Sequence, residues 1–64
     1  MVVINGEKVQ AQGKTIGQYI EEAGYNKDRV VVEINMEIIP KDKLDTIILN
    51  EGDSVEILNF VGGG

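Results

Sequence analysis

The stretch MVVINGEKVQA, residues 1–11, predicts a β-hairpin from which the rest of the fold can be built outward. Residues 1–5 are rich in β-branched side chains, which favour strands. Asn5 and Gly6 both tolerate positive φ angles, which suits a tight type I′ turn between antiparallel strands. Residues 8–11 then return as a second strand, with Val9 and Ala11 on one face.

A helix is predicted next, over residues 15–24. Thr15 is a good N-cap, and Gln18 three residues later completes a capping box. Gly24 stands where a left-handed C-terminal cap belongs. Gly17 is unfavourable inside a helix, so we expect it to permit close packing on the sheet. The apolar stripe at helical spacing consists of Ile16, Tyr19, Ile20 and Ala23.

The middle of the chain predicts a polar connection over residues 25–29, followed by a strand over residues 30–35. Residues 38–39 form a short extended piece that Pro40 ends. Residues 41–49 are expected to be irregular or briefly helical. Strand alternation places Val30, Val32 and Ile34 on one face, opposite Val31, Glu33 and Asn35. The expected anchors of residues 41–49 are Leu44, Ile48 and Leu49.

A turn at residues 51–53 leads into a last strand over residues 54–60. Strand alternation places Val55 and Ile57 on one face. Glu56, Leu58 and Phe60 fall on the other face. The order strand, strand, helix, strand, short strand, strand predicts an α+β fold, with one helix crossing one face of a mixed sheet and the other face left available.

Composition limits the chemistry that the chain can carry out. A chain of 64 residues forms at most one domain, and 42% apolar residues are enough for a folded one. The sequence contains no cysteine and no histidine, which excludes disulfides, cysteine–histidine zinc sites and catalysis by either side chain. We therefore expect no enzyme, no cofactor and no metal site.

The formal net charge of −5 disfavours binding to nucleic acids or anionic membranes and favours a basic partner surface, although solubility alone also explains it. The longest apolar runs span about four residues, against roughly 20 for a membrane helix. No basic and apolar leader opens the sequence, so a cytoplasmic protein is expected.

The order and spacing of these segments resemble the ThiS-like sulfur carriers of thiamin biosynthesis. The matching segments are Ile4-Asn5-Gly6, Thr15-Ile16, residues 30–35, residues 37–40, residues 51–57 and the terminal residues 60–64. One departure is Met36, which stands where many relatives carry a glycine. The turn after Asn35 is therefore not fixed by the resemblance.

The resemblance implies a ubiquitin-like β-grasp fold: a mixed sheet of four to five strands with one helix packed on one face. Residues 1–64 would form one domain with a flexible tail at 61–64, monomeric when free. An E1-like (ThiF-like) enzyme would adenylate the Gly64 carboxylate, and a sulfur donor protein would convert it to a thiocarboxylate. A thiazole synthase (ThiG-like) would then receive the sulfur.

Glycine suits such a tail because it has no Cβ and a narrow channel can grip its backbone closely. We expect Gly62, Gly63 and Gly64 to thread into the partner. Terminal glycines alone are often only frayed ends, so this expectation rests on the whole pattern. An apolar docking patch is expected just before the tail, at Leu58, Phe60 and Val61.

Alternatives remain open at this point. A molybdopterin synthase small subunit, or the sulfur carrier of another pathway, shares the fold and the glycine end. A ubiquitin-like modifier would instead join Gly64 to lysines of target proteins, and an interaction module would not need a free carboxylate. Gly13-Lys14-Thr15 lacks the upstream spacing of a phosphate-binding loop. Glu51, Asp53 and Glu56 are better explained by a solvated turn than by a metal site.

Overall fold

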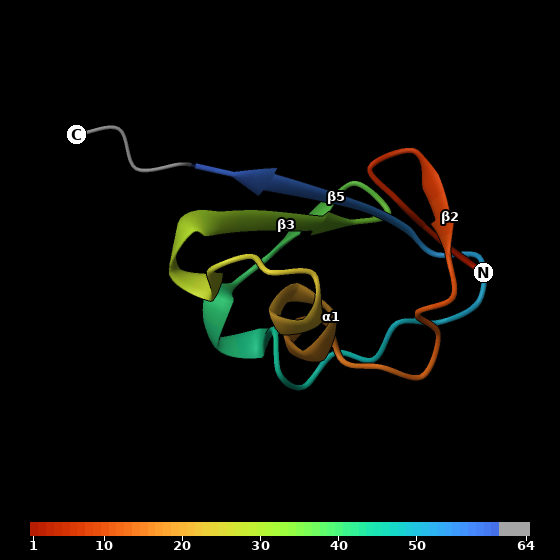
Figure 1. The fold of residues 1–64 in the computed structure, drawn as a ribbon, viewed down its shortest axis with the longest axis horizontal. Helices are drawn as coiled ribbons and strands as arrows, with labels where there is room; N and C mark the ends of the chain where they lie inside the picture. The colour runs from red at the N-terminus through yellow and green to blue at the C-terminus, as the bar shows by residue number, and fades with distance from the viewer. Residues whose placement is uncertain (61–64) are drawn as a thin grey trace.

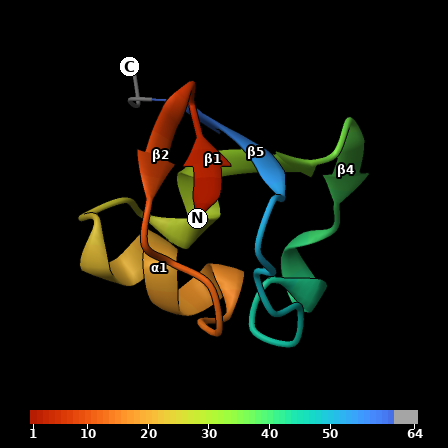
Figure 2. The same cartoon turned by 90° about the vertical axis from the view of Figure 1, so that its right-hand side faces the viewer.

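The computed structural model describes residues 1–60, which form a five-stranded mixed sheet with one α-helix across one of its faces (Figures 1 and 2). The strand order is β2-β1-β5-β3-β4. β1 and β5 run parallel, and the other neighbouring pairs are antiparallel. The elements are β1 Val2–Ile4, β2 Glu7–Val9, α1 Ile16–Glu22, the 3₁₀ turn η1 Lys27–Arg29, β3 Val30–Ile34, β4 Glu37–Ile39, the 3₁₀ turn η2 Lys41–Lys43 and β5 Ser54–Asn59. The predicted fold class is confirmed.

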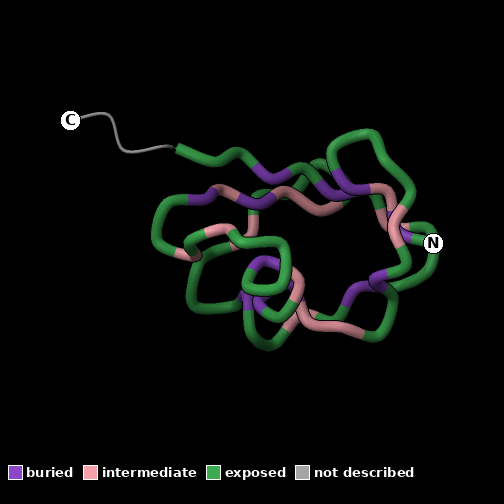
Figure 3. Tube along the Cα trace, viewed as in Figure 1, coloured by how far each residue is buried: buried purple, intermediate pink, exposed green. Residues whose placement is uncertain are grey.

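The core lies between α1 and one face of the sheet, where the buried segments of Figure 3 face each other. Alternation along each strand sends every second side chain to this face. Val30 and Val32, which were predicted to share one face of β3, are both buried, and Ile34 on the same face is half-buried against the core. Val55 and Ile57 on β5 are buried as well. The other members of the core are Val2, Ile4, Ala11, Ile16, Ile20, Leu44 and Leu49.

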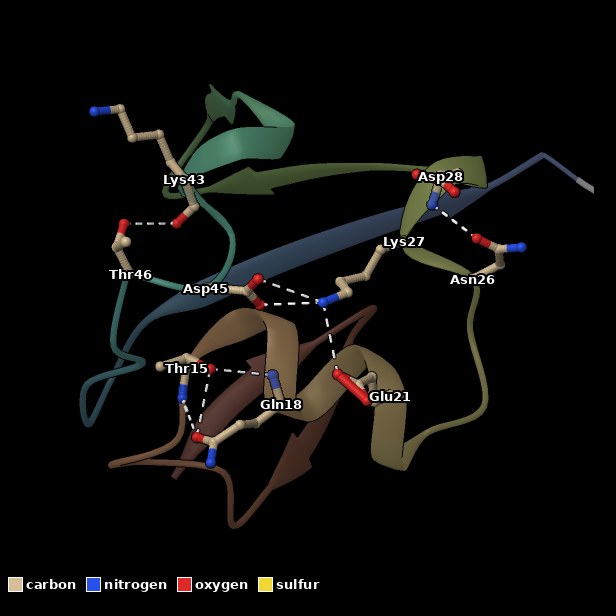
Figure 4. Close-up of polar contacts among 9 residues, drawn as sticks. All are labelled: Thr15, Gln18, Glu21, Asn26, Lys27, Asp28, Lys43, Asp45 and Thr46. Atoms are coloured by element: carbon tan, nitrogen blue, oxygen red, sulfur yellow. Dashed lines mark hydrogen bonds and ion pairs between the residues drawn. The ribbon is translucent and has the colours of Figure 1, made fainter.

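The N-terminus of α1 is capped from two directions. The predicted capping box is present: the Gln18 amide donates to Thr15 Oγ1 at 3.1 Å, and the Thr15 amide donates to Gln18 Oε1 at 2.9 Å (Figure 4). The backbone amides of the two residues between Thr15 and Gln18 donate to the segment that follows η2. Ile16 N donates to Ile47 O at 3.0 Å, and Gly17 N donates to Leu44 O at 2.9 Å. All of these groups would otherwise be orphan donors.

α1 ends at Glu22, one residue before the last member of the predicted apolar stripe, Ala23. Glu22 is the last helical residue, and Gly24 follows with φ +87°, the left-handed cap that the sequence predicted. The Tyr25 amide donates back to Ile20 O at 3.0 Å and closes this cap. Ala23, which the helical spacing assigned to the apolar stripe, is the C-cap residue and is exposed.

Gly17 faces Asp45 rather than the sheet, which corrects the expectation of close packing there. A Cβ added at Gly17 would collide with the Asp45 carboxylate. That carboxylate accepts a hydrogen bond from Lys27 Nζ at 3.2 Å, and Lys27 also lies 3.6 Å from a Glu21 oxygen (Figure 4). The hydrogen bond and charge of Asp45, together with Glu21, raise the pKa of Lys27. The missing side chain at Gly17 leaves room for this link between α1, η1 and the segment after η2.

Two further expectations about single residues were wrong. β2 ends at Val9 instead of continuing to Ala11, because the Ala11 amide turns back to Val9 O at 3.0 Å. Ala11 is nevertheless buried.

Ile48 is 52% exposed while its neighbour Leu49 is 1% exposed, since alternate side chains of an extended segment point to opposite sides. The other two residues expected to anchor this region, Leu44 and Leu49, are buried.

The hairpins β1–β2 and β3–β4 turn in the same way. Asn5 and Gly6 have φ angles of 51° and 84°, which fits the predicted turn with two positive φ angles. Asn35 and Met36 repeat this geometry with φ angles of 50° and 72°. Asparagine and glycine tolerate this region, whereas the Cβ of methionine is strained there.

Met36→Gly is expected to raise the free energy of unfolding by about 0.5–1 kcal/mol, because glycine removes the left-handed strain. The Met36 side chain is 93% exposed, so little packing is lost. Chemical denaturation measures the change. Met36→Ala is the matched control, because alanine keeps the Cβ, and an equal gain in that variant would show that φ strain is not the cause.

The Asn5 side chain also extends the sheet beyond the end of β1. Its Oδ1 accepts a hydrogen bond from the Ile57 amide at 2.8 Å, and its Nδ2 donates to Ile57 O at 3.2 Å. The amide side chain thus bonds to β5 where the backbone of β1 has already turned away. Sequence reasoning assigned Asn5 only to the turn and missed this second role.

Asn5→Ala is expected to lower the free energy of unfolding by about 2 kcal/mol. The Ile57 amide and carbonyl lose their partner, and alanine is strained at φ 51°. Asn5→Gly is the informative companion, because glycine accepts the φ angle and loses only the side-chain bonds. Equilibrium denaturation of both variants separates the two contributions, and a wild-type midpoint for Asn5→Gly would disprove a role for the side-chain bonds.

Candidate functional site: the open face of the sheet and the end of β5

The face of the sheet opposite α1 is open to solvent among the described residues, and we call it the open face (Figure 2). Alternation on β5 directs Glu56 and Leu58 to this face, because their neighbours Val55 and Ile57 are buried against α1. Val31 on β3 lies directly opposite Leu58, and Ile38 on β4 is 66% exposed.

β5 is the central strand, and it is held along its whole length. At its start, the backbone amide of Ser54 donates to the side-chain Oδ1 of Asn35 at 3.0 Å. The backbone amide of Asn35 donates in return to Ser54 O at 2.7 Å. In the middle, Asn5 bonds both backbone groups of Ile57. Past its end, the Phe60 amide donates to Arg29 O at 2.8 Å. The chain is therefore fixed to the sheet up to the last described residue.

The structure places two of the predicted docking residues at solvent-exposed positions. Leu58 is 47% exposed and Phe60 is 59% exposed, at the end of β5 nearest the C-terminal tail (Figure 1). Val61 of the predicted patch lies outside the described residues, as do Gly62, Gly63 and Gly64 of the predicted tail site. Exposed apolar side chains gathered near a functional end are typical of interaction surfaces.

The open face also carries a feature that sequence reasoning missed. Glu33 on β3 stands directly opposite Glu56 on β5. Together with Met36 and Ser54 they line a hollow of about 220 Å³. Alternation alone could have assigned both glutamates to one face, but only the β3–β5 register shows that they are neighbours.

No cluster of three or more potential metal ligands is present within residues 1–60. Among the same residues, no helix has the length and apolar character needed to cross a membrane. The exposed features of the described residues are the apolar end of β5 and the hollow beside Glu33 and Glu56.

A mixed five-stranded sheet with one helix on one face, ending in a central strand that leads to a glycine terminus, defines the ubiquitin-like β-grasp class of protein. The family model described as "ThiS family" matches residues 1–64. The chain therefore belongs to the ThiS family, and the resemblance drawn from the sequence is confirmed.

Individual relatives agree with this assignment. The sulfur carrier protein ThiS of Bacillus subtilis is 35% identical over 66 residues, covering 100% of both chains. The crystal structure of the thiamine biosynthesis protein ThiS from Geobacter metallireducens superimposes with a TM-score of 0.75 at 27% identity, covering 98% of this chain and 97% of that one.

A different kind of relative is longer. The thiazole synthase of Paramagnetospirillum magneticum is 39% identical over 64 residues, which is 98% of this chain but 20% of that protein. The chain thus spans about one fifth of the length of the thiazole synthases that it matches. Those proteins contain a stretch similar to this whole chain and a much larger remainder.

Proposed function

We propose that this chain is a sulfur carrier for thiazole formation in thiamin biosynthesis, with Gly64 as the residue that carries the sulfur. The observation that carries the proposal is the match of the complete chain to the ThiS family, including ThiS sulfur carriers that it covers from end to end. The exposed apolar end of β5 supports it, because this end of the strand leads into the glycine tail.

The chemistry acts on the C-terminal carboxylate, which is a poor electrophile by itself. An E1-like adenylating enzyme joins the Gly64 carboxylate to AMP from ATP and releases pyrophosphate. The outer sulfur of a persulfide on a donor protein then attacks the acyl carbon, and AMP leaves to give an acyl disulfide. A thiol attacks the donor's sulfur in that disulfide, forms a new disulfide with the donor, and releases the thiocarboxylate on Gly64. The carrier supplies no catalytic group in this scheme: it is a substrate that must be presented correctly, not an enzyme.

Leu58, Phe60 and Val61 form the proposed docking patch for these partners, and Gly62, Gly63 and Gly64 the proposed thread. Burial of the patch supplies affinity that offsets the entropy of ordering a glycine-rich segment. In this proposal, residues 1–64 act as one domain with a flexible tail at 61–64, monomeric when free. The proposed location is the cytoplasm, where ATP for the adenylation is available.

Thiazole synthase is the proposed acceptor of the sulfur. Support comes from the thiazole synthases that include a stretch similar to this chain, since two functions joined in one polypeptide commonly act together. The adenylating enzyme and the sulfur donor are proposed as further partners because the chain resembles the ThiS-like carriers.

The test is sulfur transfer between purified proteins. The chain is loaded with ATP, the adenylating enzyme and a sulfur donor, and then offered separately to thiazole synthase and to the large subunit of molybdopterin synthase. We expect the thiocarboxylate to be consumed only with thiazole synthase. Consumption only by the molybdopterin enzyme would assign the carrier to that pathway, and conjugation of the chain to protein lysines would identify a modifier.

A further inference from the structure

Glu33 and Glu56 form a like-charged pair at the centre of the open face. They are direct partners in the β3–β5 register, where Cβ atoms lie about 4.5–5.5 Å apart. Within residues 1–60, neither carboxylate forms an ion pair or a side-chain hydrogen bond. Like charges in this arrangement repel each other and destabilise the sheet. The free chain therefore carries an electrostatic cost at this position.

The hollow is lined by the two glutamates, Met36 and Ser54, and exposed apolar side chains lie close to it. Met36, which lines the hollow with the two glutamates, is 93% exposed. Ile38 lies next to Glu33 in the β3–β4 register and is 66% exposed, and Leu58 follows Glu56 two residues along β5. A negatively charged hollow of about 220 Å³ is thus flanked by exposed apolar side chains.

This combination is complementary to a long cationic side chain. Lysine and arginine have an aliphatic stem that packs on apolar groups and a charged head that pairs with carboxylates. One cation between two carboxylates neutralises both and removes their repulsion. A neutral or acidic partner surface would instead leave the two charges desolvated and unpaired.

We propose that the hollow between Glu33 and Glu56 receives a single lysine or arginine side chain of thiazole synthase when that enzyme docks on the open face. The inference deepens the proposed function and rests on it. The ion pair fixes how the partner is seated on the sheet, and Leu58 and Phe60 provide apolar contact on the side of the tail. The net charge of −5 adds attraction toward a basic surface.

The proposal predicts opposite effects on stability and on binding. Glu33→Gln combined with Glu56→Gln removes the repulsion, so the double variant is expected to unfold at the same temperature as the wild type or a higher one. Its affinity for thiazole synthase from the same organism is expected to be about tenfold weaker. Isothermal titration calorimetry and thermal unfolding measure the two quantities.

A matched control carries the same change of charge elsewhere. Glu7→Gln combined with Asp42→Asn neutralises two exposed carboxylates, in β2 and η2, that do not line the hollow. We expect this control to bind close to the wild-type affinity. Equal weakening in both double variants would overturn the proposal, because net charge alone would then explain the effect.

Other results separate this inference from the function on which it rests. Unchanged binding by the Glu33→Gln, Glu56→Gln variant, or easier unfolding of that variant, would overturn the hollow as a cation site while the sulfur carrier role stands. The intact mass of the wild-type chain after incubation with the loading enzymes tests the sulfur carrier role independently of the hollow. A wild-type chain that loads no sulfur and does not bind thiazole synthase would overturn both.

Discussion

Deletion of Gly64 is expected to abolish sulfur loading completely. The carboxylate is the only proposed site of adenylation, and the deletion moves it one residue back from the position at which the partner's catalytic groups act. Since reacting groups must be placed to within about 1 Å, this shift removes the reaction rather than slowing it slightly. Intact mass spectrometry after incubation with ATP, adenylating enzyme and sulfur donor measures the loaded fraction.

The folded part of the chain should not respond to this deletion. Phe60 is still bonded to Arg29, and the core of residues 2–57 is untouched, so the unfolding midpoint is expected to stay at the wild-type value. Addition of one serine after Gly64 is the companion variant, because it moves the carboxylate forward instead of back. Normal loading of either variant would contradict Gly64 as the attachment residue.

Ile20→Ala is expected to lower the free energy of unfolding by a large fraction of its total. Ile20 is 0% exposed and packs between α1 and the sheet. Truncation of a buried isoleucine to alanine costs about 2–5 kcal/mol, and small domains have only about 5–15 kcal/mol in total. Chemical denaturation followed by circular dichroism should show a large fall in the denaturant concentration at the unfolding midpoint.

Ile48→Ala is the matched control for this prediction, since it makes the same chemical change at a residue that is 52% exposed. Its expected effect is within about 0.5 kcal/mol, as for other surface substitutions. Equal losses at the two positions would contradict the placement of the core between α1 and the sheet.

Local signals in the sequence were sufficient for most of the fold. The capping box at Thr15, the left-handed cap at Gly24 and the turn at Asn5-Gly6 depend on residues a few positions apart, and all three are present. Period-two patterns likewise identified the buried faces of β3 and β5. Such features are encoded by neighbours along the chain, so one sequence suffices to find them.

Two of the errors concern residues whose environment is set by distant parts of the chain. Ile48 is as apolar as Leu49, and only the bridge between Thr15 and Ile48 fixes which of them turns inward. Gly17 was expected to meet the sheet, but it meets Asp45, 28 positions further along the sequence. No local pattern contains information of this kind.

In the candidate site, too, local patterns predicted some features, and contacts between distant strands determine others. Leu58 was assigned to the open face by alternation, and the structure places it there. The pairing of Glu33 with Glu56 depends on the register between two strands, which the sequence does not specify by itself. The role of Gly64 came from the resemblance to a family, because a glycine has no side chain whose chemistry could reveal it.

Whether the Gly64 carboxylate carries sulfur can be read from the intact mass of the untagged protein isolated from cells grown without thiamin. We expect a species heavier by one oxygen-to-sulfur exchange, located at Gly64 by fragmentation and absent after deletion of that residue. Detection of only the unmodified mass, even after incubation with ATP, the adenylating enzyme and a sulfur donor, would contradict the sulfur-carrying role of Gly64.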